Sequence, residues 1–321
     1  MKIRSALRAA LGGLILVVSA STFAQAYPER PVTVIIPFPP GGTLDFVGRL
    51  LSQKLGDQMG QNFVVDNRAG AGGTIGAGMV ARAQPNGYTL LFNASTFTTT
   101  PMAMATPPYD VVTDFQPIAL VALAPMALAI NPNVPATDLK GLIAHARANP
   151  GKVTFGTAAT ASASHLATEA LKRSSGIDFL IVFYKGSGPV YQDLIGGRID
   201  AFIDPILGSA PHAKAGRLKV IAVTSKNRLS NLPDIPAMAE TVPGFEFYSW
   251  YGLWGPAKLP NEMVQRLNAE VNKALAGDMR DKLVPQGLVL TPGSVADFVR
   301  FQKDDMERSA KIITEGKIRV E

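Results

Sequence analysis

The residues best suited to chemistry in this chain stand where a strand-like run ends and a helix-like run begins. The first such junction joins Val32–Ile36 to Pro37-Phe-Pro-Pro-Gly-Gly-Thr-Leu-Asp45. Glycines at a helix N-terminus leave backbone N–H groups free to hold an anion without a charged side chain. We therefore predict a ligand-binding loop here, although a plain proline-stiffened turn is the alternative. Its predicted ligand-binding residues are Phe38, Pro40, Gly41, Gly42, Thr43 and Asp45.

Two of these residues have more specific expected roles. Thr43 offers a hydroxyl at the N-cap of the helix, and Asp45 falls in the first turn. A carboxylate there disfavours a second full negative charge close by. Asp45 would orient Thr43 or a bound water, or would compensate the helix dipole.

Similar junctions recur further along the chain. Asn93-Ala-Ser-Thr96 ends a predicted strand, and Thr157–His165 links a strand to a helix. Tyr184-Lys-Gly-Ser-Gly-Pro189 is a third strand–glycine–helix junction, with Pro189 expected as the first helical residue. Ligands of open α/β sheets bind at the carboxyl ends of the strands. The further predicted ligand-binding residues are Ser95, Thr96, Thr160, Ser162, Ser164, His165, Lys185, Gly186, Ser187 and Asp204.

Catalytic and metal chemistry are less well supported. Ser164 beside His165 suggests a nucleophile, but the chain has no G-x-S-x-G, and neighbours in sequence do not face each other on a helix. Asp200 and Asp204 would share a strand face without a third metal ligand. Gly76-Ala-Gly-Met-Val-Ala81 matches G-x-G-x-x-A but lies inside a predicted helix. We expect no catalytic residue, no metal and no cofactor.

The first 26 residues have the pattern of a secretory signal peptide. Lys2, Arg4 and Arg8 precede a short apolar run, Leu11–Val18, and Ala24-Gln25-Ala26 forms an A-x-A cleavage site. The apolar run is too short to span a membrane. We predict cleavage after Ala26 and a periplasmic product.

Composition excludes several classes of function. The net charge of +6 falls to about +3 without the three basic residues of the signal segment, and the remaining basic residues are scattered. This gives no support for nucleic-acid or membrane-surface binding. The absence of cysteine excludes disulfides, thiolate catalysis and cysteine-based metal sites.

Alternating strand-like and helix-like runs predict an α/β protein with two lobes. The order strand–helix–strand–helix–strand over residues 32–92 indicates a parallel sheet covered by helices, and a second such set follows residue 130. We expect two chain crossings, near residues 122–130 and 244–250, with a ligand cleft between the lobes. The predicted division is domain 1 at 27–124 and 248–321, and domain 2 at 125–247. Strand order stays open.

Several segments resemble the Bug-type substrate-binding receptors of tripartite tricarboxylate transporters. The similarity is carried by Pro37–Asp45 and by four further sets of motifs along the mature chain. These are Val65-Asp-Asn-Arg-Ala-Gly-Ala-Gly-Gly73, Pro85-Asn-Gly-Tyr-Thr-Leu-Leu91, Tyr184-Lys-Gly-Ser187 with Asp193-Leu-Ile-Gly-Gly197, and Leu232-Pro-Asp-Ile-Pro236 with Pro243-Gly-Phe-Glu246. The resemblance implies a type II-like periplasmic binding fold, in which each lobe is a mostly parallel sheet flanked by helices.

The resemblance also implies a function. Such receptors capture a small carboxylate in a closing cleft, through backbone N–H groups and water, and deliver it to membrane permease subunits. The implied contacts are Phe38–Thr43, Ser95-Thr96, Ser162–His165, Tyr184–Gly188 and Asp204. We expect a monomer that is not an enzyme.

The ligand and two rival functions stay open at this stage. The segment Gly156–Ser164 has less glycine than the family pattern, and Asp204 precedes Pro205 where a polar residue is usual. Without a clear second cationic partner, these departures favour a ligand with an apolar body, such as an aromatic carboxylate. The rivals are an exported serine hydrolase using Ser164 or Ser187, and a phosphate or nucleotide binder.

Overall fold

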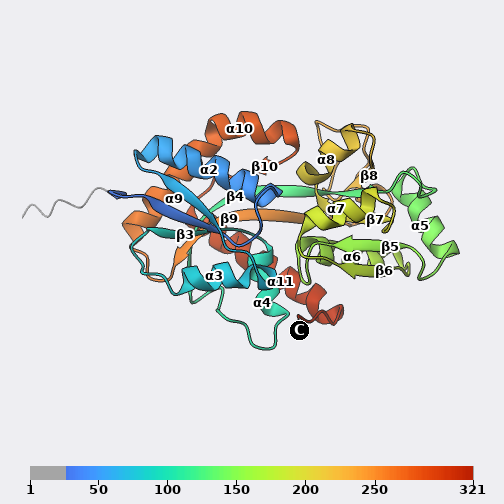
Figure 1. Cartoon of the computed structure of the whole chain (residues 1–321), viewed down its shortest axis with the longest axis horizontal. Helices are drawn as coiled ribbons and strands as arrows, with labels where there is room; N and C mark the ends of the chain where they lie inside the picture. Colours follow the sequence, from blue (N-terminus) through green and yellow to red (C-terminus); the bar gives the residue numbers. More distant parts are fainter. Residues whose placement is uncertain (1–26, 321) are drawn as a thin grey trace, which may run out of the picture.

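The computed structural model describes residues 27–320, and its centre is a ten-stranded mixed sheet (Figure 1). Eight strands lie in the order β2-β1-β3-β9-β4-β7-β5-β6, and β8 and β10 pair with β4. The bounds are β1 Val32–Ile36, β2 Phe63–Asn67, β3 Thr89–Ala94, β4 Phe115–Ile130, β5 Thr154–Thr157, β6 Leu180–Phe183, β7 Ala201–Pro205, β8 Lys219–Val223, β9 Tyr248–Pro256 and β10 Val289–Leu290.

The long strand β4 belongs to both lobes. Its residues 115–125 pair with β9, and from Met126 onward it pairs with β7, while β8 lies on its other side. β1, β2 and β3 are parallel in one lobe, and β5, β6 and β7 are parallel in the other. β3 is antiparallel to β9, and β7 is antiparallel to β4. Each parallel group therefore directs its carboxyl ends toward the other lobe.

Helices cover both faces of each part of the sheet (Figure 1). One apolar core in the first lobe joins the sheet to α2, α9 and α10, and another joins it to α3, α4 and α11. The helix bounds are α2 Thr43–Met59, α3 Thr74–Ala81, α4 Thr96–Met102, α5 Leu139–Ala148, α6 Ala163–Ser175, α7 Ser187–Ile195, α8 Ile206–Lys214, α9 Asn261–Ala276, α10 Asp278–Leu283 and α11 Val295–Glu315. Short 3-10 turns lie at Ala71–Gly73, Met238–Glu240 and Val284–Gln286.

The predicted α/β fold with two lobes is confirmed, with one refinement. The sheet is mixed, because the two crossing strands β4 and β9 run in opposite directions and add antiparallel pairs to each parallel group. Two local predictions were wrong. Gly42, not Thr43, is the N-cap of α2, and Pro189 is the third residue of α7 rather than its first.

A small residue of α3 packs closely against the segments beside it. A Cβ atom added to Gly76 in α3 would lie 2.8 Å from the carbonyl oxygen of Arg68 and 2.8 Å from Pro37. The G-x-G-x-x-A match therefore serves helix packing beside the first glycine loop.

The lobes also touch outside the crossing strands. α11 packs against α6, and an apolar cluster joins Ala103, Ile313 and Ile318 to Ala161 and Leu166. Arg173 of α6 and Glu315 of α11 form an exposed ion pair at 2.7 Å. The domain boundaries predicted from the sequence stay a proposal, and the end of α11 reaches the second lobe. None of the helices within residues 27–320 has the length and apolar character of a membrane span.

Candidate functional site

The strand ends bring the predicted loops of both lobes to the crossing strands. β3 ends at Ala94, opposite Tyr251 of β9, and Ser95 follows with its N–H bonded to the carbonyl of Trp250 at 2.9 Å. In the second lobe Asp204 pairs with Ala127 of β4, just past the point where β4 changes partners. The other loops follow β1, β5 and β6, which neighbour these strands in parallel. We define the site as loops 37–43, 94–96, 158–164 and 184–188, with Asp204.

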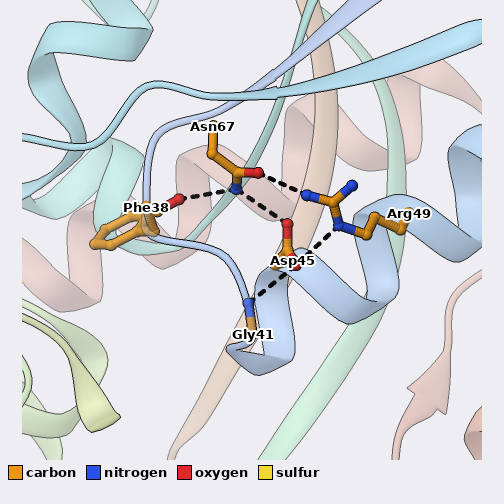
Figure 2. A network of polar contacts seen from close by, with 5 residues as sticks. All are labelled: Phe38, Gly41, Asp45, Arg49 and Asn67. Atoms are coloured by element: carbon orange, nitrogen blue, oxygen red, sulfur yellow. Dashed lines mark hydrogen bonds and ion pairs between the residues drawn. The ribbon is translucent and has the colours of Figure 1, made fainter. Parts of the chain in front are cut away.

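The carboxylate of Asp45 anchors loop 37–43 to the body of the first lobe (Figure 2). This buried group accepts the N–H of Gly41 at 3.0 Å, Nε of Arg49 at 2.9 Å and Nδ2 of Asn67 at 3.0 Å. Asn67 also donates to the carbonyl of Phe38 at 2.9 Å and accepts from Arg49 at 2.7 Å. Both ends of the loop are therefore fixed to the body of the lobe.

The same contacts determine the charge of Asp45. Burial alone would raise the pKa of its carboxyl, but the hydrogen bonds from Arg49, Gly41 and Asn67 outweigh burial and hold the pKa below its ordinary value. Asp45 is thus an ionised brace with all its short contacts inside the lobe. The described contacts of Asp45 are with Gly41, Arg49 and Asn67 rather than with Thr43, so its expected role of orienting Thr43 or a bound water stays a prediction.

The front of the first loop is open. Gly42 has a β-region φ of −85°, and a Cβ atom added to it would meet nothing within 4 Å. Gly41 has φ of +91°, a conformation that favours glycine. Within the described chain, the N–H groups of Gly42, Thr43 and Leu44 have no protein acceptor. These groups form an unfilled donor set at the N-terminus of α2.

Loop 158–164 of the second lobe is braced by serines. Ser164 Oγ accepts the N–H of Ala158 at 2.9 Å and lies 2.9 Å from Ser162 Oγ. Ser162 is the N-cap of α6 and accepts the N–H of His165. The His165 ring is buried, and its Nδ1 accepts the N–H of Ala161 at 3.1 Å. Thr160 is partly exposed at the loop tip.

Loop 184–188 lies against loop 158–164, because the N–H of Gly186 donates to the carbonyl of Ala158 at 2.7 Å. Lys185 is exposed, and Cβ atoms added to Gly186 and Gly188 would meet nothing within 4 Å. The N–H groups of Ser187 and Gly188 have no protein acceptor within residues 27–320. The second lobe therefore also offers free donors beside glycines.

Asp204 lies beneath this loop. Its Oδ1 accepts the Ser187 hydroxyl at 2.9 Å, and its Oδ2 accepts the Tyr191 hydroxyl at 2.9 Å. Asp204 is 5% exposed, and burial raises its pKa to about 7 despite the two hydrogen bonds. Tyr251 of β9 is buried at the crossing, and its pKa is raised by burial and then by the charge of this carboxylate.

One hydrogen bond joins helix α4 of the first lobe to loop 158–164 of the second. Thr99 Oγ1 of α4 donates to the carbonyl of Ala161 at 2.6 Å, and both groups are buried. Ala161 has a φ of +57°, which an alanine seldom adopts. The helix that begins at Thr96 is therefore tied directly to loop 158–164.

The site does not contain the geometry of a serine hydrolase. Nδ1 of His165 accepts a backbone N–H and its Nε2 lies 3.8 Å from Glu169, while His145 and His212 have Asn149 and Arg217 as neighbours. Within residues 27–320 no histidine ring is hydrogen-bonded to a serine, and no group of three His, Asp or Glu residues could hold a metal ion. Two surface hollows of about 290 Å³ and 350 Å³ lie elsewhere, beside α2 and between α6 and α11.

Several supporting residues were not predicted from the sequence. Arg49 follows Asp45 by four residues and Tyr191 follows Ser187 by four, so helical spacing could have indicated both pairs. Asn67 ends β2, beside the first glycine loop. Thr99 and its partner Ala161 are 62 residues apart, and no local pattern indicates that contact.

Two lobes with facing strand ends, and with free backbone donors in each, are the arrangement of two-lobed solute-binding proteins. Comparison with known sequences then identifies the family. Residues 47–318 match the tripartite tricarboxylate transporter family receptor, TctC, and the chain belongs to this family. The resemblance to Bug-type receptors is confirmed.

Similar proteins extend over nearly the whole chain. A protein from the tcbD-tcbE intergenic region of Pseudomonas sp. (strain P51) is 37% identical, over 97% of this chain and 95% of its own length. Protein BugT of Bordetella pertussis is 35% identical, over 93% of each chain. R. palustris Rpa4515 with adipate has a TM-score of 0.88 and 35% identity, covering 91% of this chain and 99% of that one. MatC of Rhodopseudomonas palustris with bound malate has a TM-score of 0.83 and 29% identity, covering 89% and 100%.

Proposed function

We propose that this receptor captures one small dicarboxylate between its lobes and delivers it to the membrane permease subunits of a tripartite tricarboxylate-type transporter. The observation that carries the proposal is the presence of unpaired backbone N–H groups in both lobes, at strand ends that face each other. Those of Gly42 and Thr43 serve one lobe, and those of Ser187 and Gly188 serve the other. Similar receptors hold adipate and malate.

Backbone donors suit reversible capture of a carboxylate. Neutral N–H groups at helix N-termini stabilise an anion through the helix dipole and through hydrogen bonds, and they carry no group that would transform it. The ionised Asp45 stands behind the first loop and keeps its backbone in place. The proposed contacts with ligand are therefore Phe38–Thr43, Ser95-Thr96, Thr160–Ser164 and Lys185–Gly188.

Lys185 is the residue that would favour a dicarboxylate over a monocarboxylate as the ligand. Within the described loops 37–43, 94–96, 158–164 and 184–188 it is the one lysine or arginine, and it is exposed beside Gly186. A second carboxylate would bind its ammonium group, whereas an aromatic monocarboxylate would not need it. Lys185→Met should weaken a dicarboxylate by about tenfold and leave a monocarboxylate little changed, as titration calorimetry would measure.

The test of the proposed function is a thermal-shift screen of residues 27–321. The panel would contain adipate, malate, citrate, benzoate, inorganic phosphate and AMP, because any ligand that binds the native state must raise the melting temperature. We expect dicarboxylates to give the largest shift. A shift with phosphate or AMP and none with carboxylates would contradict the proposal.

A hydrolase is tested separately with activated esters. Turnover by the wild-type protein that is lost in Ser164→Ala or Ser187→Ala would contradict a receptor without enzymatic activity. Export is tested by N-terminal sequencing of the protein from the periplasmic fraction, where we expect Tyr27 as the first residue. Residues 1–26 lie outside the described structure, so the predicted cleavage after Ala26 stays a proposal, as does the monomeric state.

A further inference from the structure

Asp204 is a buried carboxylate whose hydrogen-bond partners are neutral. Its two contacts are the hydroxyl groups of Ser187 and Tyr191, and a Cβ atom added to Gly208 of α8 would lie 2.8 Å from Oδ2. The residue that pairs with Asp204 on the neighbouring strand β4 is the apolar Ala127. A buried ionised carboxylate normally has a cation or several N–H donors, as Asp45 does. Asp204 has neither among the described residues.

The contact with Ser187 links this carboxylate to the proposed ligand. The serine hydroxyl has one proton, and in the structure that proton is donated to Oδ1 of Asp204. With Asp204 ionised, the Ser187 hydroxyl can offer a ligand only its oxygen lone pairs, which repel a carboxylate. With Asp204 protonated, the carboxylic acid donates to Ser187 Oγ, and the serine proton is free to bond a ligand oxygen.

We infer that Asp204 makes capture of an anionic carboxylate proton-linked, so that one proton from solvent binds Asp204 as the carboxylate binds beside Ser187. This inference rests on the proposed function. No bond is broken apart from the exchange of hydrogen bonds, and the bound proton partly balances the negative charge of the ligand. Asp204 is here a positioning and selectivity residue, acting through the Ser187 hydroxyl.

The pH range follows from the surroundings of Asp204. Burial raises its pKa to about 7, so it is largely protonated at pH 6 and largely ionised above pH 8 in the free receptor. A nearby carboxylate ligand raises the pKa further. Since one proton is linked to each ligand, the affinity should fall by about tenfold per pH unit above the pKa of the free receptor.

Other titratable groups near Asp204 define the controls. Tyr191 and Tyr251 face it, and burial raises the pKa of both phenols well above the ordinary value, so they stay neutral here. The ring of His212 in α8 packs against that of Tyr191, with centroids 4.9 Å apart and the planes tilted by 44°. Burial, then Arg217, lowers the His212 pKa. Lys185 precedes Ser187 in the same loop and is exposed.

The experiment is calorimetric titration of residues 27–321 with adipate, at about pH 6 and about pH 8.5, in buffers of different ionisation enthalpy. The buffer dependence of the heat gives the number of protons bound with each ligand. We expect close to one proton at the higher pH and close to zero at the lower. Asp204→Asn mimics the protonated group and should bind at both pH values without proton uptake. His212→Asn should behave as wild type.

The outcomes separate the proton linkage from the proposed function. Adipate binding by the wild-type receptor without proton uptake at pH 8.5 overturns this inference and leaves the proposed function intact. Proton uptake that disappears in His212→Asn and persists in Asp204→Asn overturns it as well. Failure of the whole carboxylate panel to bind at pH 6 overturns both. The proton count of the wild-type receptor decides the inference even where a variant fails to fold.

Discussion

The two lobes each brace a glycine loop with a buried aspartate, but the two carboxylates lie in opposite electrostatic settings. Asp45 accepts from a guanidinium, a backbone N–H and an amide, and these contacts lower its pKa. Asp204 accepts from two hydroxyl groups, and burial raises its pKa to about 7. The first loop is therefore held by a fixed charge, and the second by a group that titrates near neutral pH.

The difference shows that the nature of the donors decides the role of a buried carboxylate. The Asp45 carboxylate stays ionised over the physiological pH range, so its hydrogen bonds to the first loop do not change with pH. The Asp204 network couples the loop to protonation, because hydroxyl groups can reverse the direction of a hydrogen bond and N–H groups cannot. The following variants test this comparison, from the largest expected effect to the smallest.

Removal of the Asp45 carboxylate should have the largest effect. Asp45→Ala leaves the Gly41 N–H and the Asn67 amide without their acceptor, so we expect a loss of about 3 kcal/mol of unfolding free energy in urea. The loop would lose its fixed conformation, and adipate should bind at least about tenfold more weakly. Asp45→Asn keeps an acceptor oxygen and should cost about half as much. A variant as stable as wild type would show that the brace is dispensable.

The pH dependence of stability should have opposite signs for the two carboxylates. The Asp204 pKa is about 7 in the folded protein, against an ordinary value of 3.8, so the folded state is favoured by protonation. Its contribution is complete below pH 3.8 and is lost as the pH rises toward 7 and beyond. Between pH 5 and 8 wild type should lose about 2–3 kcal/mol relative to Asp204→Asn, by urea unfolding.

Asp45 supplies the contrast. Because its folded pKa lies below 3.8, its contribution is present above that value and is lost as the pH falls through the folded pKa. The difference in stability between wild type and Asp45→Asn should therefore be constant between pH 5 and 8. If the stability difference between wild type and Asp45→Asn changed with pH in the same way as that between wild type and Asp204→Asn, the comparison would be contradicted.

The hydrogen bond between the lobes should contribute less. Thr99→Val removes the donor to Ala161 and should cost about 1 kcal/mol. Thr98→Val is the matched control, because Thr98 donates only to Ser95 within its own lobe. Both variants should lose similar stability, but only Thr99→Val should change adipate affinity. Equal affinities in the two variants would show that this contact does not link the lobes to binding.

The exposed ion pair should have the smallest effect. Arg173 and Glu315 are each about half exposed, at 40% and 43% of the side chain, so Arg173→Ala should cost at most about 0.5 kcal/mol. The cost should vanish at about 1 M salt. A larger, salt-independent loss would mean that α11 holds the second lobe more firmly than the described contacts indicate.

Much of the fold could be predicted because local signals agreed with the tertiary structure. The helical spacing of Leu139, Leu142 and Ala146 indicates helix α5, and Ser294 with Asp297 forms the capping box that begins α11. Helices α4 and α8 were missed, because threonines, Pro101 and Pro211 give weak helical signals and packing decides the outcome. β4 was recognised as a crossing strand through its long apolar run.

The glycine and serine loops of the candidate site could be located from the sequence, but the residues that hold these loops in place could not. Glycine and serine junctions indicate where backbone donors are free, since those features are local in sequence. The identity of each brace depends on contacts between distant segments, as with Asn67 at Phe38 and Thr99 at Ala161. The Asp204 setting depends on burial by several elements, which a sequence pattern does not capture.

The central claim is that exposed glycine backbones of both lobes hold one dicarboxylate ligand. A single methyl group added to a glycine of each lobe tests it. Gly42→Ala and Gly188→Ala place a Cβ in open space at backbone angles that alanine can adopt, so the melting temperature should not change. Gly293→Ala, with ordinary contacts far from the loops, is the control. Calorimetric titration with adipate should show a loss of at least about tenfold in affinity for both site variants and none for the control. Wild-type affinity in both site variants would contradict the account.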